Sequence, residues 1–186
     1  RFGRAACEGL LQGQILPVIK HIPGHGRATV DSHDALPHVD TPRAELTRTD
    51  FAPFRALHEM PWAMTAHVVY EAIDPDMPAT LSPRVVADVI RGEIGFDGVL
   101  VSDDLSMGAL KGSLSERAES AMAAGCDVAL HCNGKIDEMI EVAKASTSLT
   151  DAARRRLAAG NARRTPVVPF DRTGAVERLR KLMAAV

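Results

Sequence analysis

Four short apolar runs recur along the chain, and each is followed by a loop and a stretch with helical spacing. The runs cover residues 15–19, 62–69, 99–102 and 127–132. Short apolar runs that alternate with helices are typical of parallel strands joined by right-handed crossovers. The pattern therefore predicts an α/β fold on one parallel sheet, with functional residues at the carboxyl ends of the strands.

Helices are expected before, between and after these runs. Apolar spacing and capping residues predict them over 1–13, 42–57, 83–94, 114–124, 136–145, 151–162 and 173–185. The last two helices carry runs of Arg and Lys, for which solvent-exposed faces are the simplest interpretation. A long loop over residues 20–42 interrupts the rhythm, and loops beyond about 12–15 residues are usually functional or disordered.

The number of repeats is too small for a closed barrel. Four βα units occupy the 186 residues, whereas a complete (βα)8 TIM barrel needs about 250. The chain also begins in mid-helix, without an initiating Met. We therefore expect residues 1–186 to be the C-terminal portion of a single barrel domain, covering roughly the last four βα units and the C-terminal helices, with the N-terminal strands missing.

Composition excludes several kinds of partner. The formal net charge of -2 gives no reason to expect nucleic acid or an acidic membrane surface. Neither a membrane span of roughly 18 apolar residues nor a signal peptide is visible. Cys7, Cys126 and Cys132 have no CxxC spacing, so free thiols in a reducing compartment are expected. We predict a cytoplasmic protein.

The long loop opens with chemically active side chains. The sequence reads Lys-His-Ile-Pro-Gly-His-Gly from residue 20 and Asp-Ser-His from residue 31. Lys20 and His21 can donate hydrogen bonds to hydroxyl groups at the end of a strand. Asp31 lies two residues from His33, and such a carboxylate can orient an imidazole and raise its basicity for general acid/base catalysis. A surface Asx-turn beside an exposed histidine is the alternative for this pair.

A second charged cluster, Ser102-Asp103-Asp104, ends the third apolar run. An acid at the carboxyl end of a strand is a candidate nucleophile or metal ligand, and a helix N-cap is the alternative. Because adjacent aspartates point in different directions, one can face the site while the other anchors the loop. His67 ends the second run, where a buried structural histidine and a site residue are both open interpretations.

A metal site is a further possibility for these side chains. Suitable ligand types are present at His21, His25, His33, His67 and Asp103. The expected helices carry no HxxxH pair and the expected strands no HxH pair. We therefore predict neither a metal nor a cofactor.

Three motifs resemble family 3 glycoside hydrolases of the β-N-acetylhexosaminidase type. They are the loop motif over 20–33, Met-Thr-Ala-His-Val-Val-Tyr over 64–70, and Gly-Phe-Asp-Gly-Val-Leu-Val-Ser-Asp-Asp-Leu-Ser-Met over 95–107. They occur in the family's order within residues 20–133. The ending Ser-Asp-Asp-Leu-Ser-Met resembles the single-domain hexosaminidases rather than the two-domain β-glucosidases, which usually carry Ser-Asp-Trp.

The resemblance implies a retaining double displacement. Asp103 would be the nucleophile that forms a covalent glycosyl-enzyme. His33, paired with Asp31, would be the acid/base in place of the usual carboxylic acid. An imidazole with a pKa near 6.5 can both give and accept a proton near neutral pH.

The resemblance also implies a substrate. Lys20 and His21 would hydrogen-bond the hydroxyls of a non-reducing N-acetylglucosamine, and we count His67 among the substrate-binding residues. The family's substrate is N-acetylglucosamine β-1,4-linked to 1,6-anhydro-N-acetylmuramic acid, with or without its peptide. The implied role is cytoplasmic peptidoglycan recycling without a metal. Because the family's first four strands supply further sugar ligands, we expect inactivity until the missing N-terminal half of the barrel is provided.

Two alternatives stay open at this point. A β-N-acetylglucosaminide phosphorylase would use phosphate in place of water, since histidine rather than a carboxylate is the expected acid/base. A catalytically inactive sugar-binding fragment would follow from the absent N-terminal strands.

Overall fold

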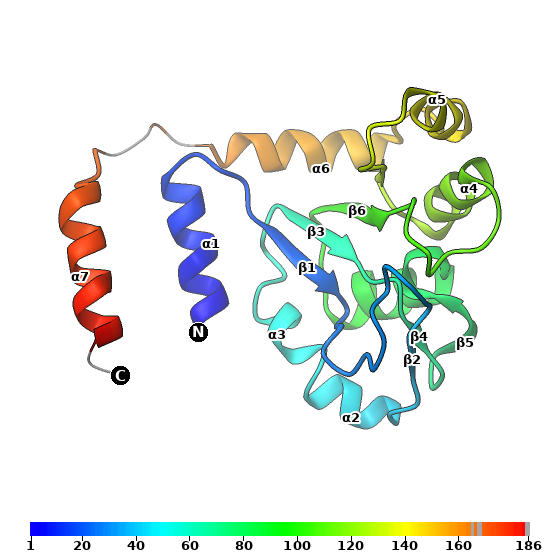
Figure 1. Cartoon of the computed structure of the whole chain (residues 1–186), viewed down its shortest axis with the longest axis horizontal. Coiled ribbons are helices and arrows are strands. Elements are labelled where there is room, and N and C mark those ends of the chain that lie inside the picture. Colours follow the sequence, from blue (N-terminus) through cyan, green and yellow to red (C-terminus); the bar gives the residue numbers. More distant parts are fainter. Residues whose placement is uncertain (165, 167–168, 185–186) are drawn as a thin grey trace.

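The computed structural model describes residues 1–164, 166 and 169–184. At its centre lies a parallel sheet with the strand order β1-β3-β6-β7 (Figure 1). Its strands are β1 (Val18–Ile22), β3 (Trp62–Thr65), β6 (Val99–Asp104) and β7 (Val128–Leu130). Each of the four predicted runs contributes one strand, and every pairing is parallel. The predicted α/β fold on one parallel sheet is confirmed.

The first strand is displaced from its predicted position. It covers Val18–Ile22 rather than residues 15–19. Pro17 has no N–H to donate to a ladder, so the strand begins after it. As a consequence, Lys20 and His21 lie on the strand itself and not in the loop that follows.

The second predicted strand also ends early, at Thr65 rather than at residue 69. The carbonyl of Ala66 accepts the backbone N–H of Thr80, and the chain leaves the main sheet at this point. It then enters a small sheet of β2 (His38–Val39), β4 (Val69–Tyr70) and β5 (Asp74–Pro78). This sheet was not predicted, because β2 lies within the expected loop 20–42 and Val69 of β4 was expected to continue the second strand of the main sheet.

The helices follow the expected order with one break. They are α1 (Phe2–Gln12), α2 (Arg43–Arg48), α3 (Ala52–Arg55), the 3-10 helix η1 (Ala79–Leu81), the wide π-type helix η2 (Val85–Glu93), α4 (Leu114–Ala124), α5 (Ile136–Ala145), α6 (Asp151–Ala162) and α7 (Arg172–Ala184). The predicted helix 42–57 is two short helices, because Pro53 fits the first turn of α3 but not a helix interior. Ala185, the predicted end of α7, lies outside the described residues.

Local signals explain where helix α4 begins and ends. Ser113 accepts the N–H of Glu116 and the Glu116 carboxylate accepts the N–H of Ser113, a capping box. Gly125 ends the helix with a φ of 111°, a left-handed conformation that glycine adopts without a Cβ clash. In Figure 1, α4 and α5 lie at one side of the sheet, α6 crosses above β3 and β6, and α2 and α3 lie below.

One basic side chain of α6 does not lie on a solvent-exposed face as predicted. The Arg156 side chain is only 21% exposed and pairs with both Asp97 and Asp127. Asp127 also binds Arg91 and the N–H of Leu100. These contacts tie α6 to the start of β6.

Helix α7 stands apart at the left of Figure 1, beyond α1, and buries none of its described residues. None of the described helices is both long and apolar enough to cross a membrane.

Candidate active site

Strand β6 carries the candidate nucleophile at its carboxyl end. Asp103 is 7% exposed, and its backbone N–H donates to Thr65 Oγ1 at 3.2 Å. Its Oδ1 accepts the N–H of Asp104 at 2.9 Å. Its Oδ2 lies 3.6 Å from Nε2 of His21. One carboxylate oxygen is therefore held by backbone while the other faces an imidazole.

His21 reaches this carboxylate across the sheet. It lies on β1, and β3 separates β1 from β6. Burial lowers the pKa of the His21 imidazole, and the nearby charge of Asp103 opposes that effect. Lys20 is exposed one residue earlier, and its charge further lowers the pKa of His21. A cation and a neutral ring thus stand together at the end of β1.

The second aspartate of the pair has a different role. Asp104 accepts hydrogen bonds from the N–H and hydroxyl of Ser106 and from the N–H of Cys132. Burial alone raises the pKa of Asp104, but these hydrogen bonds outweigh it and bring the pKa below its usual value. Asp104 anchors the loop after β6, in keeping with the expected division between adjacent aspartates.

The predicted acid/base pair is formed. Nδ1 of His33 lies 2.7 Å from Oδ1 of Asp31, and the same oxygen accepts the His33 N–H at 2.9 Å. The hydrogen bond to Asp31 raises the pKa of His33, and hydrogen bonds from His33 lower the pKa of Asp31. Both side chains are exposed, at 73% and 64%. Nε2 of His33 is thereby left to face a ligand.

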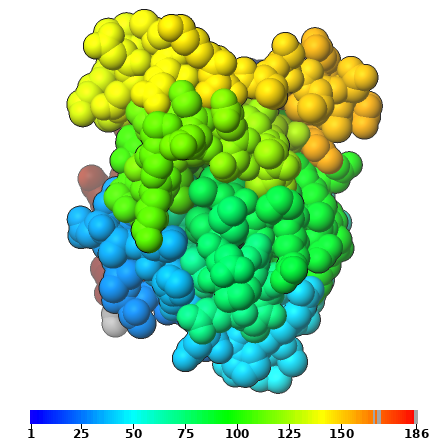
Figure 2. Space-filling model, turned by 90° about the vertical axis from the view of Figure 1, so that its right-hand side faces the viewer, coloured from blue at the N-terminus to red at the C-terminus, as the bar shows by residue number. Residues whose placement is uncertain are grey.

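The loop that carries Asp31 and His33 is attached to the loop that follows β6. Gly108 donates its N–H to the carbonyl of His33, and Ala109 donates to that of Ser32. The Ser32 hydroxyl also lies 3.2 Å from Nε2 of His25. In Figure 2 the blue surface of this loop lies directly beside green surface. Gly108 was not predicted from the sequence, because a glycine carries no side chain to mark such a contact.

His67 is a correction to the predicted site. It is completely buried. Its Nδ1 lies 2.8 Å from Thr80 Oγ1, and its Nε2 donates to the carbonyl of Asp104 at 3.0 Å. Since both ring nitrogens are occupied, neither is free for a sugar hydroxyl. The geometry fits the alternative of a buried structural histidine, and we withdraw the expected substrate contact.

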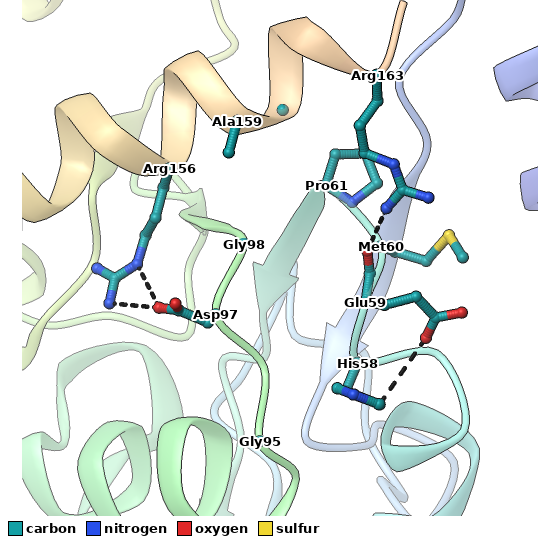
Figure 3. A pocket seen from close by; sticks show the side chains of 11 residues that line it. His58, Glu59, Met60, Pro61, Gly95, Asp97, Gly98, Arg156, Ala159 and Arg163 are labelled. Carbon is teal, nitrogen blue, oxygen red and sulfur yellow. Dashed lines mark hydrogen bonds and ion pairs between the residues drawn. The ribbon is translucent and has the colours of Figure 1, made fainter.

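An open pocket elsewhere on the molecule has no part in this site. Figure 3 shows a space of about 250 Å³ lined by Pro61, Asp97, Gly98, Arg156 and Arg163, among others. Pro61, Asp97 and Gly98 lie just before β3 and β6, at the opposite end of the sheet from the candidate nucleophile, and the two arginines come from α6 and its C-terminal end. Among residues 1–164, 166 and 169–184, no group of three or more His, Cys, Asp or Glu could hold a metal ion.

A parallel α/β sheet with a carboxylate and an imidazole–carboxylate pair at its carboxyl edge is a candidate active site of an α/β enzyme. Residues 1–159 match the model of the glycosyl hydrolase family 3 N terminal domain. The chain belongs to this family.

Named relatives agree with the family assignment. The chain is 46% identical over 134 residues to a β-hexosaminidase of Alkalilimnicola ehrlichii, covering 70% of this chain and 38% of that protein. It is 43% identical over 141 residues to a β-hexosaminidase of Pseudomonas aeruginosa, covering 74% and 40%. The chain therefore spans about two fifths of the length of these relatives.

Solved structures share the fold. NagZ from Neisseria gonorrhoeae in complex with N-trifluoroacetyl-D-glucosamine superposes with a TM-score of 0.74 at 34% identity, covering 98% of this chain and 52% of that chain. A family 3 β-N-acetylglucosaminidase from a Paenibacillus species gives a TM-score of 0.79 at 33% identity, covering 92% and 36%.

Proposed function

We propose that this chain carries the nucleophile, the acid/base and part of the sugar subsite of a retaining β-N-acetylglucosaminidase. The observation that carries the proposal is the 3.6 Å approach of His21 Nε2 to Asp103 Oδ2 at the carboxyl edge of the sheet. The Asp31–His33 pair on the neighbouring loop supplies the second catalytic function. Relatives named β-hexosaminidase support the choice of sugar.

Two displacements complete the proposed reaction. In the first, Oδ2 of Asp103 bonds to the anomeric carbon while the glycosidic C–O bond breaks. His33 passes its Nε2 proton to the leaving oxygen. In the second, His33 takes a proton from water, the water oxygen bonds to the anomeric carbon, and the bond to Asp103 breaks. Two inversions retain the β configuration.

The hydrogen bond to Asp31 decides which nitrogen of His33 transfers the proton. Nδ1 is held 2.7 Å from the carboxylate, so proton transfer falls to Nε2. Lys20 and His21 would contact the hydroxyls of N-acetylglucosamine at the non-reducing end. The proposed substrate is N-acetylglucosaminyl-1,6-anhydromuramic acid, with or without peptide, and the proposed setting is cytoplasmic peptidoglycan recycling without a cofactor.

We also propose that residues 1–186 form the C-terminal portion of one barrel domain, whose N-terminal half is the partner that completes the site. Strand β1 is an edge of the main sheet. Its first residue, Val18, is 42% exposed, and Ile15, shortly before it, is 56% exposed. Apolar side chains at a strand edge favour a further strand there. The share of each relative that the chain spans supports the same proposal.

The test is an assay of this chain with and without that half. The completed enzyme is made by placing the N-terminal part of the Pseudomonas aeruginosa relative, up to its matched segment, before Arg1. It is expected to release N-acetylglucosamine first as the β anomer, which NMR distinguishes from the α anomer, whereas the 186-residue chain alone is inactive. Sugar 1-phosphate formed only in phosphate buffer would identify the phosphorylase instead. Binding of the sugar without turnover would identify the inactive fragment.

A further inference from the structure

Three buried side chains form a continuous series of four hydrogen bonds behind the Asp103 carboxylate. The N–H of Asp103 donates to Thr65 Oγ1 at 3.2 Å, and that oxygen lies 2.7 Å from Thr80 Oγ1. Thr80 Oγ1 lies 2.8 Å from Nδ1 of His67, whose Nε2 donates to the carbonyl of Asp104. The two threonines and the histidine are completely buried.

The direction of each hydrogen bond follows from the bond between His67 Nε2 and the carbonyl of Asp104. A carbonyl only accepts, so the proton of His67 is on Nε2. Burial lowers the pKa of His67, while the carbonyl of Asp104 and the charge of Asp103 oppose that effect. A neutral ring that carries its proton on Nε2 accepts at Nδ1. Thr80 therefore donates to Nδ1 of His67 at 2.8 Å, with the carbonyl of Ala66 as a second, more distant acceptor at 3.1 Å. Thr65 donates to Thr80 in turn.

Both ends of this series of hydrogen bonds hold the backbone around Asp103 and Asp104. One end holds the N–H of Asp103 and the other holds the carbonyl of Asp104, so the peptide group between the two residues is fixed from both sides. The N–H of that peptide donates to Asp103 Oδ1 at 2.9 Å. The orientation of this peptide group thus decides which oxygen of Asp103 accepts the backbone hydrogen bond and which faces His21.

We propose that His67 is a positioning residue, which acts through Thr80 and Thr65 to keep Oδ2 of Asp103 directed at the substrate. The proposal rests on the proposed role of Asp103 as the nucleophile. The hydroxyls are required as relays, each accepting one hydrogen bond and donating another, which an apolar side chain of the same shape cannot do.

The test compares three variants of this chain. Thr80→Val removes the hydroxyl at nearly constant shape, and Thr80→Ser keeps it. The matched control is Ser82→Ala, which removes another completely buried hydroxyl, bonded to Asp74 and to the N–H of Val85 outside the relay. In the completed enzyme, Thr80→Val is expected to lower kcat about 100-fold, the effect of misplacing a reacting group by about 1 Å. KM is expected to stay nearly constant, Thr80→Ser to recover kcat, and Ser82→Ala to leave it unchanged.

Two measurements on the full 186-residue chain do not depend on turnover. Nitrogen-15 NMR of the His67 ring is expected to find the proton on Nε2 at pH 7, and a proton on Nδ1 would overturn the proposal. A crystal structure of the Thr80→Val variant is expected to lose the bond between Asp103 Oδ1 and the Asp104 N–H. Retention of that bond, or a kcat loss equal to that of Ser82→Ala, would overturn it too. An inactive wild-type enzyme would instead refute the proposed function.

Discussion

Oδ1 of Asp31 binds both Nδ1 and the backbone N–H of His33, at 2.7 and 2.9 Å. The carboxylate therefore fixes the ring relative to its own backbone and stabilises the imidazolium form. This hydrogen bond raises the pKa of His33. A proton donor with a raised pKa keeps its proton to higher pH, which suits the proposed first step of the reaction.

Replacing Asp31 by Asn is expected to move the alkaline limb of the kcat/KM profile to lower pH. His33 donates only when it is protonated, and Asp31 raises its pKa. Removing that carboxylate lets the ring lose its proton at a lower pH. The measurement is a pH–rate profile of the completed enzyme on a substrate with a poor leaving group. A dinitrophenyl glycoside, whose departure needs little protonation, is the control and is expected to respond less. An alkaline limb that does not move would contradict the role of Asp31.

Replacing Gly108 by Ala is expected to displace the acid/base loop. A Cβ at this position would lie 2.7 Å from the His33 carbonyl and 3.1 Å from that of Asp34. We expect kcat/KM to fall by up to about 100-fold, because His33 moves away from the reacting bond. Gly26 lies in open space within the same loop, so Gly26→Ala is the matched control. Equal activity of the two variants in the completed enzyme would contradict the docking of the loop at Gly108.

Replacing Asp127 by Ala is expected to lower the free energy of unfolding by about 3–5 kcal/mol, the usual result of leaving a buried ion pair without one partner. Its carboxylate is only 4% exposed and binds Arg91 and Arg156 at 3.0 Å each. Urea titration of the 186-residue chain measures the change. Glu8→Ala removes an exposed partner of Arg4 and is expected to cost less than about 1 kcal/mol. Similar losses for both variants would contradict the structural role of the buried pair.

Much of the fold was predictable because the sequence signals that determine each element lie within or next to that element. Apolar runs bounded by turns located the four parallel strands. Gly125 marked the end of α4, and its start was expected at Ser113 or Ser115, of which Ser113 is the cap. The pairing of Asp31 with His33 was also predictable, because the two residues are close in sequence and a short turn brings them together.

The remaining features depend on contacts between distant segments. Thr80 reaches His67 only because η1 folds against the segment that follows β3, and neither residue carries a local signal of that contact. The same holds for Arg156, whose partner Asp127 lies 29 residues earlier. Periodicity describes one element at a time, so it assigned Arg156 to solvent and gave no sign of the hydrogen bonds that occupy both ring nitrogens of His67.

The central claim, that Asp103 attacks the sugar, is tested most directly by trapping the covalent intermediate. A 5-fluoro N-acetylglucosaminyl fluoride destabilises the positively charged transition states, while its good leaving group favours formation of the intermediate. Mass spectrometry of the completed enzyme after proteolysis is predicted to find one added sugar, attached to Asp103 and absent in Asp103→Asn. A sugar attached to another residue, or undiminished turnover by Asp103→Asn, would contradict the account.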